Sequence, residues 1–250
     1  MPLSTWQEQL NRDIPIPIYY QLSQLIRKDI EDGVYQPGDT IPTEAEFCTS
    51  LAISRPTVRQ SMNELVNEGI LNRIKGKGTF VSHPKVEANF IQKLEGFHTS
   101  MLSKGMHPRT QVLQLEIGPA IPEYNSILQI ALNQPLVVLR RLCFADNIPM
   151  VLLECYLPGK RFAGLVDEDL VNNSLYTLFL AHYDTDVMLV RRQIEAVNAG
   201  QREADLLGVQ KGRALCLVHN IAHDQNGIPV EYNIAYYRGD RNKFTMELQK

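Results

Sequence analysis

The most constraining feature of this chain is a helix-forming segment that runs directly into a basic hairpin, between residues 54 and 81. Ser54 can cap a helix through its hydroxyl, and Pro56 falls in the first turn, where a missing N–H costs no intrahelical hydrogen bond. Gly69 can end the helix in a left-handed conformation. The sequence therefore predicts a helix with a defined start and a defined end.

This helix has one apolar stripe and one polar N-terminal surface. The residues at 3.6-residue spacing are Val58, Met62, Leu65 and Val66. The polar side chains left on other faces are Arg55, Thr57, Arg59 and Asn63. We expect the apolar stripe to be buried and the polar side chains to be available to a ligand.

Two short strands are predicted after the helix, at 70–74 and 79–81, with a basic tip between them. Gly76 and Gly78 let the backbone of this tip approach a phosphate or the minor groove closely. Lys75, Lys77 and Arg73 supply the positive charge that such an approach needs. The hairpin therefore has the composition of a DNA-binding wing.

The segment before residue 54 completes a helix-turn-helix. An apolar stripe predicts a helix from 18 to about Gly33, and Thr43 with Glu46 forms a capping box for a short helix through Leu51. Only Ala52 and Ile53 separate this helix from the next cap, which is the tight spacing of a helix-turn-helix. Residues 29–46 carry six acidic side chains and no Lys or Arg, whereas 55–85 carry six basic and two acidic ones. One surface is therefore suited to phosphates.

Residues 14–82 resemble the winged helix-turn-helix domain of bacterial GntR-superfamily transcription regulators. The similar motifs are Tyr19–Leu22, Gly33–Gly38, Ile41–Glu44, Ser54–Arg59 and Gly76–Val81. The resemblance implies that Arg55 and Gly76 contact bases and that Thr57 and Arg59 contact phosphates. Some relatives carry a further arginine where this chain has Ala45. The expected DNA-binding residues are Thr43, Glu44, Ser54, Arg55, Thr57, Arg59, Arg73, Lys75, Gly76, Lys77 and Gly78.

The composition is that of a globular protein with room for two domains, because the 250 residues are 44% apolar and 8% aromatic. A net charge of −3 does not exclude DNA binding, since binding depends on the local basic surface. Cys48, Cys143, Cys155 and Cys216 have neither metal-site nor disulfide-framework spacing. With no signal peptide or 18-residue apolar span, we expect a cytoplasmic protein with no metal, cofactor or membrane partner.

Residues 83–89 lack periodicity and are the expected linker to a second domain at 90–246. Strands are predicted at 111–117, 135–145, 150–157, 186–197, 214–224 and 230–237. Helices are predicted at about 95–105, 121–132, 174–182 and 201–207. Polar turns at 146–149 and 224–229 join consecutive strands, so those pairs are expected to be antiparallel. The chain is therefore predicted to be α+β.

The two polar turns resemble each other, because each is followed by Ile-Pro and an apolar strand that contains a glutamate, Glu154 or Glu231. Repeated hairpin chemistry and a duplicated half-site both explain this similarity. Two arginines in a later strand, Arg191 and Arg192, are also open to two interpretations. A solvated strand end is favoured over an anion-binding role.

The second domain resembles the HutC-type effector domain, the UTRA domain, whose antiparallel sheet with flanking helices is similar to chorismate lyase. The resemblance implies a small-molecule effector site and places candidate ligand-binding groups at the following positions. They are Glu95, Phe97, Arg141, Cys143, Leu153, Ser174, Glu231 and Tyr237. Relatives that hold a sugar phosphate usually have an arginine where this chain has Cys143, and a small hydroxyl pair where it has Glu95 and Gly96. Their strand glutamate is replaced by Leu153, and Glu154 should face the other side of the sheet.

These features predict a ligand-responsive transcription regulator, a repressor in most members of the family. It should bind a pseudo-palindromic operator as a homodimer and respond to a small polar metabolite such as an amino sugar, a sugar derivative or an amino-acid conjugate. The alternative is a lyase-like enzyme with an accessory head. The sequence contains no nucleophile with an adjacent base and no carboxylate pair at catalytic spacing, so the regulator is favoured.

Overall fold

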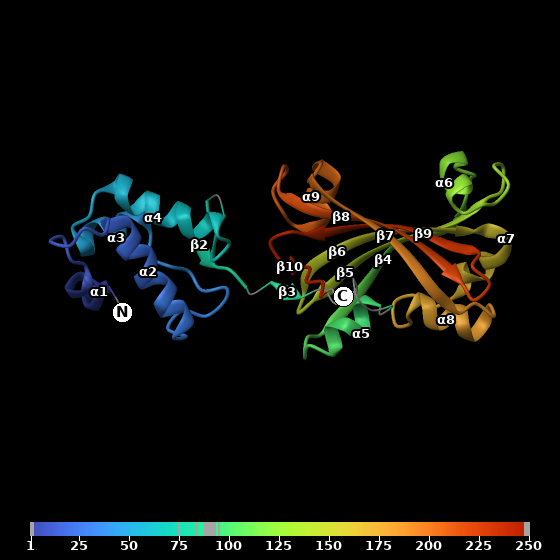
Figure 1. The fold of residues 1–250 in the computed structure, drawn as a ribbon, viewed down its shortest axis with the longest axis horizontal. Coiled ribbons are helices and arrows are strands. Elements are labelled where there is room, and N and C mark those ends of the chain that lie inside the picture. The colour runs from blue at the N-terminus through green and yellow to red at the C-terminus, as the bar shows by residue number, and fades with distance from the viewer. Residues whose placement is uncertain (1–2, 75, 84, 88–93, 95, 248–250) are drawn as a thin grey trace. The chain divides into compact units, whose positions relative to one another are not determined.

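The computed structural model of the chain describes residues 3–74, 76–83, 85–87, 94 and 96–247. It divides into two compact units, Met1–Pro84 and Lys85–Lys250. Figure 1 shows helices and a small hairpin in the first unit, and a large sheet with flanking helices in the second. The predicted α+β class is confirmed.

The N-terminal unit is a helical domain with a two-stranded hairpin. Its elements are α1 (Leu3–Gln9), α2 (Ile18–Glu31), α3 (Glu44–Leu51), α4 (Arg55–Asn67), β1 (Leu71–Ile74) and β2 (Gly78–Val81). The predicted capping box begins α3, because the Glu46 backbone N–H donates to Thr43 Oγ1 (3.3 Å) and the Thr43 N–H donates to Glu46 Oε2 (2.7 Å). Ser54 Oγ accepts from the Thr57 N–H (3.4 Å) and begins α4.

Helix α1 was not predicted from the sequence. Trp6 on this helix is nevertheless a central residue of the hydrophobic core of the N-terminal unit. The Trp6 ring is 1% exposed and stacks on Phe47 at a centroid distance of 5.8 Å. Its Nε1 donates a hydrogen bond to Asp29 Oδ2 (3.0 Å) on α2. A helix of seven residues is marginal by itself, so these tertiary contacts explain why it forms.

The hairpin β1–β2 is antiparallel and has the register expected of a wing, with Leu71 opposite Val81 and Ile74 opposite Gly78. Gly76 and Gly78 at its tip have φ of +76° and +122°. Such positive φ values strain any residue with a Cβ, which accounts for the two glycines. Lys75, between them and β1, lies outside the described residues.

A six-stranded antiparallel sheet forms the centre of the C-terminal unit. Its strands are β4 (Pro108–Gly118), β5 (Leu136–Ala145), β6 (Ile148–Pro158), β7 (Val187–Asn198), β8 (Ala214–Asp224) and β9 (Pro229–Arg238). Their spatial order is β4-β5-β6-β9-β8-β7, so two three-stranded meanders join where β6 pairs with β9. Each strand predicted from the sequence is present.

The turn between β5 and β6 is tighter than the predicted turn at 146–149. Asp146 and Asn147 both have positive φ, 47° and 64°, which is the conformation of a two-residue type I′ hairpin. Strand β6 therefore begins at Ile148, and a register shift between Cys143 and Phe144 accommodates the following proline.

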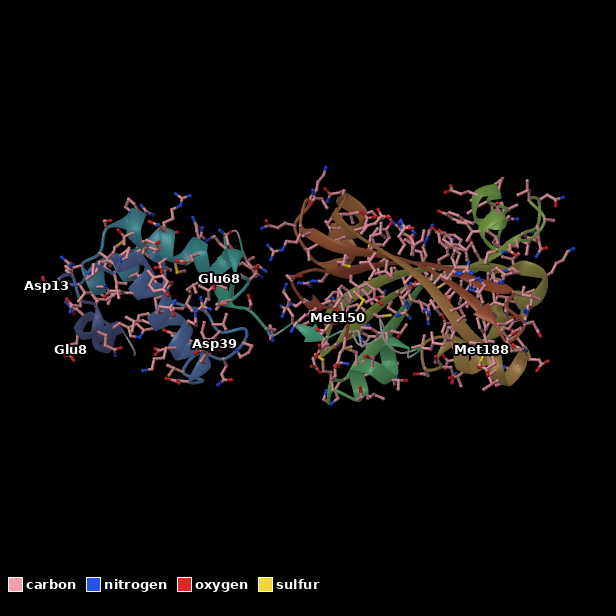
Figure 2. All side chains as sticks on the ribbon, in the orientation of Figure 1. Glu8, Asp13, Asp39, Glu68, Met150 and Met188 are labelled. Carbon is pink, nitrogen blue, oxygen red and sulfur yellow. The ribbon has the colours of Figure 1, made fainter. Side chains whose placement is uncertain are left out.

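Helices cover both faces of the sheet. They are α5 (Phe97–Leu102), α6 (Pro122–Ile127), α7 (Gly159–Phe162), the 3₁₀ helix η2 (Ala163–Asp167), α8 (Leu175–His182) and α9 (Gln201–Leu207). Figure 1 shows α5 and α8 on one side of the sheet, and α6 and α9 on the other. Side chains fill the space between these layers, with Met150 on β6 buried and Met188 on the edge strand β7 63% exposed (Figure 2).

The start and the end of the C-terminal unit meet in a small parallel pair. Strand β3 (Val86–Glu87) pairs with β10 (Asn242–Lys243). The Asn242 side chain is buried and donates from Nδ2 to the carbonyl oxygens of Met150 (3.2 Å) and Arg238 (2.9 Å). The last strand is therefore fixed to the central sheet.

Candidate DNA interface and effector cavity

The N-terminus of α4 presents exposed polar side chains over a buried apolar stripe. Val58, Met62 and Leu65 are buried, as predicted. The Arg55 side chain is 77% exposed, and Arg59 is exposed as well. Two exposed cations at the start of a helix can approach phosphates and base edges.

Glu44 lies between two of the predicted DNA-binding arginines. Its Oε1 is 3.1 Å from Arg73 Nη2, and its Oε2 is 3.9 Å from Arg55 Nε. Arg73 Nη1 also donates to Asn63 Oδ1 (3.2 Å), which ties the wing to α4. Glu44 therefore positions a basic surface that is built from α3, α4 and β1.

The hydroxyl groups among the predicted DNA-binding residues act as helix caps. Thr43 is part of the capping box of α3, and Ser54 Oγ lies 2.7 Å from Thr57 Oγ1 at the start of α4. Gly76, Lys77 and Gly78 form the tip, where the Lys77 N–H donates to the Ile74 carbonyl (3.0 Å). These residues lie at the starts of α3 and α4 and at the wing tip, and their contacts with DNA remain a prediction.

A cavity of about 140 Å³ lies in the C-terminal unit between the sheet and helices α5 and α8. All of the predicted effector-site residues that the structure describes line it. They are Phe97, Arg141, Cys143, Leu153, Ser174, Glu231 and Tyr237. Glu95 lies outside the described residues. The volume exceeds that needed for one water severalfold, so the cavity has room for a small metabolite.

Glu231 is a buried carboxylate of the cavity, with 3% of its surface exposed. The Tyr176 hydroxyl on α8 donates to Glu231 Oε2 (2.9 Å). Burial and the charge of Glu231 raise the pKa of Tyr176 well above its usual value, and burial raises the pKa of Tyr237. Both phenols are therefore protonated at neutral pH and can donate hydrogen bonds.

A polar row crosses the floor of the cavity at the level of Asn233. Asn220 on β8 is opposite Asn233 on β9, and Arg192 on β7 is opposite Asn220. Asn220 Nδ2 donates to Asn233 Oδ1 (3.0 Å), and Asn233 Nδ2 donates to Cys155 Sγ (3.0 Å). Burial raises the pKa of Cys155, so this sulfur is a thiol at neutral pH.

Arg192 lines the cavity, so the interpretation of this residue as part of a solvated strand end is wrong. The interpretation holds for Arg191, which is exposed. Adjacent residues of a strand face opposite sides of the sheet, and only the register of β7 decides which arginine faces the cavity. Tyr176, Asn220 and Asn233 were also missed. Polar residues at inward positions of apolar strands are the signal that could have indicated the two asparagines.

The two glutamates of the similar hairpins lie on opposite faces of the sheet. Glu154 is 5% exposed, lies 3.4 Å from Arg140 Nε and pairs with Arg202 of α9, whereas Leu153 lines the cavity. The predicted displacement of this glutamate to the other face is confirmed. Because Glu231 lies in the cavity and Glu154 does not, the duplicated half-site is contradicted.

The described residues contain no group of three or more His, Cys, Asp or Glu side chains arranged to hold a metal ion. In the same part of the chain, no helix has the length and apolar character needed to cross a membrane.

Comparison with protein families assigns both units. Residues 18–81 match the profile of bacterial regulatory proteins of the gntR family, and residues 103–243 match the UTRA domain. The second match alone spans more than half of the chain. The enzyme interpretation receives no support from either match.

Relatives of known name and structure agree over nearly the full length. The chain is 34% identical to the HTH-type transcriptional repressor NagR of Bacillus subtilis, over 94% of this chain and 96% of that protein. It is 33% identical to a probable fructoselysine utilization operon transcriptional repressor of Escherichia coli, over 92% and 94%. The crystal structure of PhnF from Mycobacterium smegmatis is similar with a TM-score of 0.65 and 25% identity, covering 91% of this chain and 98% of that one.

Proposed function

The chain belongs to the GntR family of bacterial regulatory proteins and is a ligand-responsive transcription regulator; from this premise we propose how it acts. It represses transcription as a homodimer that binds a pseudo-palindromic operator. One recognition helix reads about half of such a site, so the N-terminal units of two protomers are needed. A small polar metabolite in the cavity of the C-terminal unit controls binding, in the cytoplasm.

The proposal of a polar effector rests on the side chains that line the cavity. Arg141, Glu231, Tyr237 and Ser174 offer a cation, a carboxylate, a phenol and a hydroxyl within one cavity. An amino sugar, a sugar derivative or an amino-acid conjugate presents the complementary groups. The similarity to a probable fructoselysine utilization operon transcriptional repressor supports a ligand of this kind.

We expect sugar phosphates to bind weakly. Cys143 stands where phosphate-binding relatives usually carry a second arginine, and burial raises the pKa of this thiol, so it supplies no charge. Buried Glu231 adds an anion to the same cavity. Isothermal titration calorimetry checks this expectation, and tight, specific binding of a sugar phosphate would contradict it.

The effector controls DNA binding through a coupling free energy. A coupling of about 1–3 kcal/mol changes operator affinity roughly 5- to 150-fold, and operator must change effector affinity by the same factor. Measuring both affinities, each with and without the other ligand, tests this reciprocity.

Stiffening the linker is expected to reduce the response to effector. Residues 82–89 join the wing to the C-terminal unit and carry none of the proposed ligand contacts. Replacing Lys85 with proline restricts the backbone between the wing and β3 without touching either site. Operator affinity is measured with and without effector. An effector response equal to that of the wild type would refute the role of the linker.

Fluorescence anisotropy is the direct test of the proposed function. The protein is titrated at physiological salt onto labelled DNA from upstream of its own gene and onto scrambled DNA, and a metabolite panel is then added. Specific binding that one metabolite shifts supports the proposal and identifies the effector. Equal affinity for the two DNAs counts against this operator, and turnover of a bound metabolite would favour the enzyme alternative.

A further inference from the structure

Resting on the proposed homodimer, we propose that two copies of the chain pair through their β7 strands, antiparallel and with Gln193 of the two protomers opposite one another. β7 is an edge strand of the six-stranded sheet, and its second edge has no neighbouring strand in the described part of the chain. A long edge with free N–H and C=O groups is a template for another strand. The occupant assigned to this edge is a second copy of the chain.

The two edges of the sheet differ in how well they can accept a strand. β4 begins with a proline, which has no N–H, and a register shift between Val112 and Gln114 interrupts this strand. The register shift in β7 lies at its start, between Val187 and Leu189, so residues 189–198 pair with β8 in unbroken register. Because irregularities protect an edge from pairing, β7 is the edge suited to a partner strand.

β7 also carries apolar side chains that the described part of the C-terminal unit leaves exposed. Leu189 and Ile194 are both exposed, and their positions in the strand place them on opposite faces of the sheet. An open edge with apolar side chains on both faces is an aggregation hazard for a chain that stays monomeric. A partner strand alongside β7 covers both side chains.

The charge pattern of β7 selects one register for this pairing. In a two-fold antiparallel pair of identical strands, one residue lies opposite its own copy. With Gln193 at this position, Arg191 lies opposite the partner's Glu195, and the symmetric ion pair forms on the other side of the axis. Moving the axis to either adjacent residue loses both ion pairs, and an axis at Arg192 opposes two arginines. Opposite charges directly across a pair stabilise it and like charges destabilise it, so the Gln193 register is favoured.

A groove on the face of the sheet opposite the effector cavity has room for these ion pairs. Its volume is about 390 Å³, and Arg191, Gln193 and Glu195 line it along β7. Both charged side chains are exposed. Glu195 Oε1 accepts a hydrogen bond from Gln193 Nε2 (2.8 Å), and a carboxylate has lone pairs for several further donors. An arginine of a second copy can therefore join this carboxylate.

The same register brings the partner strand to the effector cavity. Val190 and Arg192 line the cavity from β7. In the pair, the partner's Ala196 lies opposite Val190, and the partner's Ile194 lies opposite Arg192. Residues directly opposite one another share a face of the sheet, so these two side chains extend the wall of the cavity. A bound effector therefore lies beside the dimer interface and can change its geometry.

Charge reversal tests this pairing in the full-length protein. Arg191→Glu and Glu195→Arg each place like charges opposite one another at two symmetric positions. We expect the dimer dissociation constant of each variant, measured by analytical ultracentrifugation, to rise roughly 10- to 100-fold. An equimolar mixture of the two variants should recover the dimer, because the mixed dimer has a glutamate opposite an arginine at both positions. This recovery also excludes misfolding as the cause of the weaker dimers.

Glu116→Arg is the matched control for charge reversal. Glu116 on β4 accepts from Gln114 (2.6 Å) in the same way as Glu195 accepts from Gln193, but it lies on the other edge of the sheet. Its reversal should leave dimerisation unchanged. Gln193→Cys gives a second measurement, because opposed Cα atoms in an antiparallel pair are about 4.5–5.5 Å apart, within disulfide range. Mild oxidation should link two chains of this variant and leave the wild type, with its four native cysteines, unlinked.

The results separate the interface from the dimer itself. If the wild type is a dimer and neither reversal changes its dissociation constant, pairing through β7 is overturned while the homodimer stands. The register is overturned if the mixture does not recover the dimer, or if dimeric Gln193→Cys does not cross-link. An equal loss of dimer in Glu116→Arg also counts against β7. A wild type that is monomeric even at the highest concentration measured contradicts both the interface and the proposed homodimer.

Discussion

Replacing Arg161 with methionine is expected to destabilise the C-terminal unit by about 3–5 kcal/mol, because it leaves a buried carboxylate without its cation. Arg161 Nη1 donates to Asp224 Oδ2 (2.7 Å), and Nη2 donates to Thr185 Oγ1 (2.7 Å). The Asp224 side chain is fully buried. Asp224 also accepts the backbone N–H groups of Asn226 (3.0 Å) and Ile228 (2.9 Å), so it fixes the turn between β8 and β9.

Chemical denaturation can distinguish this loss of stability in the C-terminal unit from any change in the stability of the N-terminal unit. Trp6 is the single tryptophan of the chain and lies in the N-terminal core, so its fluorescence reports that unit. The circular dichroism transition of the sheet should move to lower denaturant in Arg161→Met, while the Trp6 transition stays in place. Lys160→Met, an exposed change on the same helix, is the control and should have little effect. Equal stability of the two variants would contradict the role of the ion pair.

The same ion pair predicts a pH dependence. Burial alone would raise the pKa of Asp224, but hydrogen bonds from the Ile228 backbone and Arg161 outweigh it, so the pKa lies below the usual 3.8. A depressed pKa contributes stability above pH 3.8 that is lost as the pH falls through the folded-state value. The difference in stability between the wild type and Arg161→Met should therefore shrink in acid. A difference that stays constant down to pH 2 would contradict this assignment.

The elements that local pattern determines were predictable from the sequence. The cap at Ser54, the capping box at Thr43 and the αL residue Gly208 at the end of α9 are local signals, and the structure has each of them. The alternation of strand residues also predicted that Leu153 and Glu154 face opposite sides of the sheet, as they do. Period and capping chemistry operate over a few residues, so one sequence contains them.

What the sequence pattern did not indicate depends on contacts between distant segments. Helix α1 is held by Trp6 against Phe47 and Asp29, residues far away in the chain. Arg192 pairs with Asn220 of β8 and lines the cavity, and a register shift between Val187 and Leu189 precedes it in β7. Neither the pairing of β7 with β8 nor the position of a bulge is encoded in local spacing. Local spacing alone therefore could not predict which of Arg191 and Arg192 faces the cavity.

Replacing Arg55 with alanine is expected to cost about 1–3 kcal/mol in operator binding and to relax preference at one base position. Arg55 is exposed at the start of α4 and is held near Glu44, so it is presented for a base contact without a tight internal partner. A bidentate contact to a guanine edge gives discrimination of this size. Affinities for operator, for operators changed at single positions and for scrambled DNA are measured by fluorescence anisotropy at several salt concentrations.

Lys77→Ala is the variant with which the effect of Arg55→Ala on DNA affinity is compared. Lys77 is an exposed cation at the wing tip, suited to a phosphate contact that carries no sequence information. Its loss should weaken binding to all DNA alike and lower the slope of log affinity against log salt by about 1. Arg55→Ala should instead reduce the difference between the affinity for operator and the affinity for scrambled DNA. If Arg55→Ala weakens both DNAs by the same factor, Arg55 contacts phosphate, and base reading must come from another residue of α4 or from the wing backbone at Gly76.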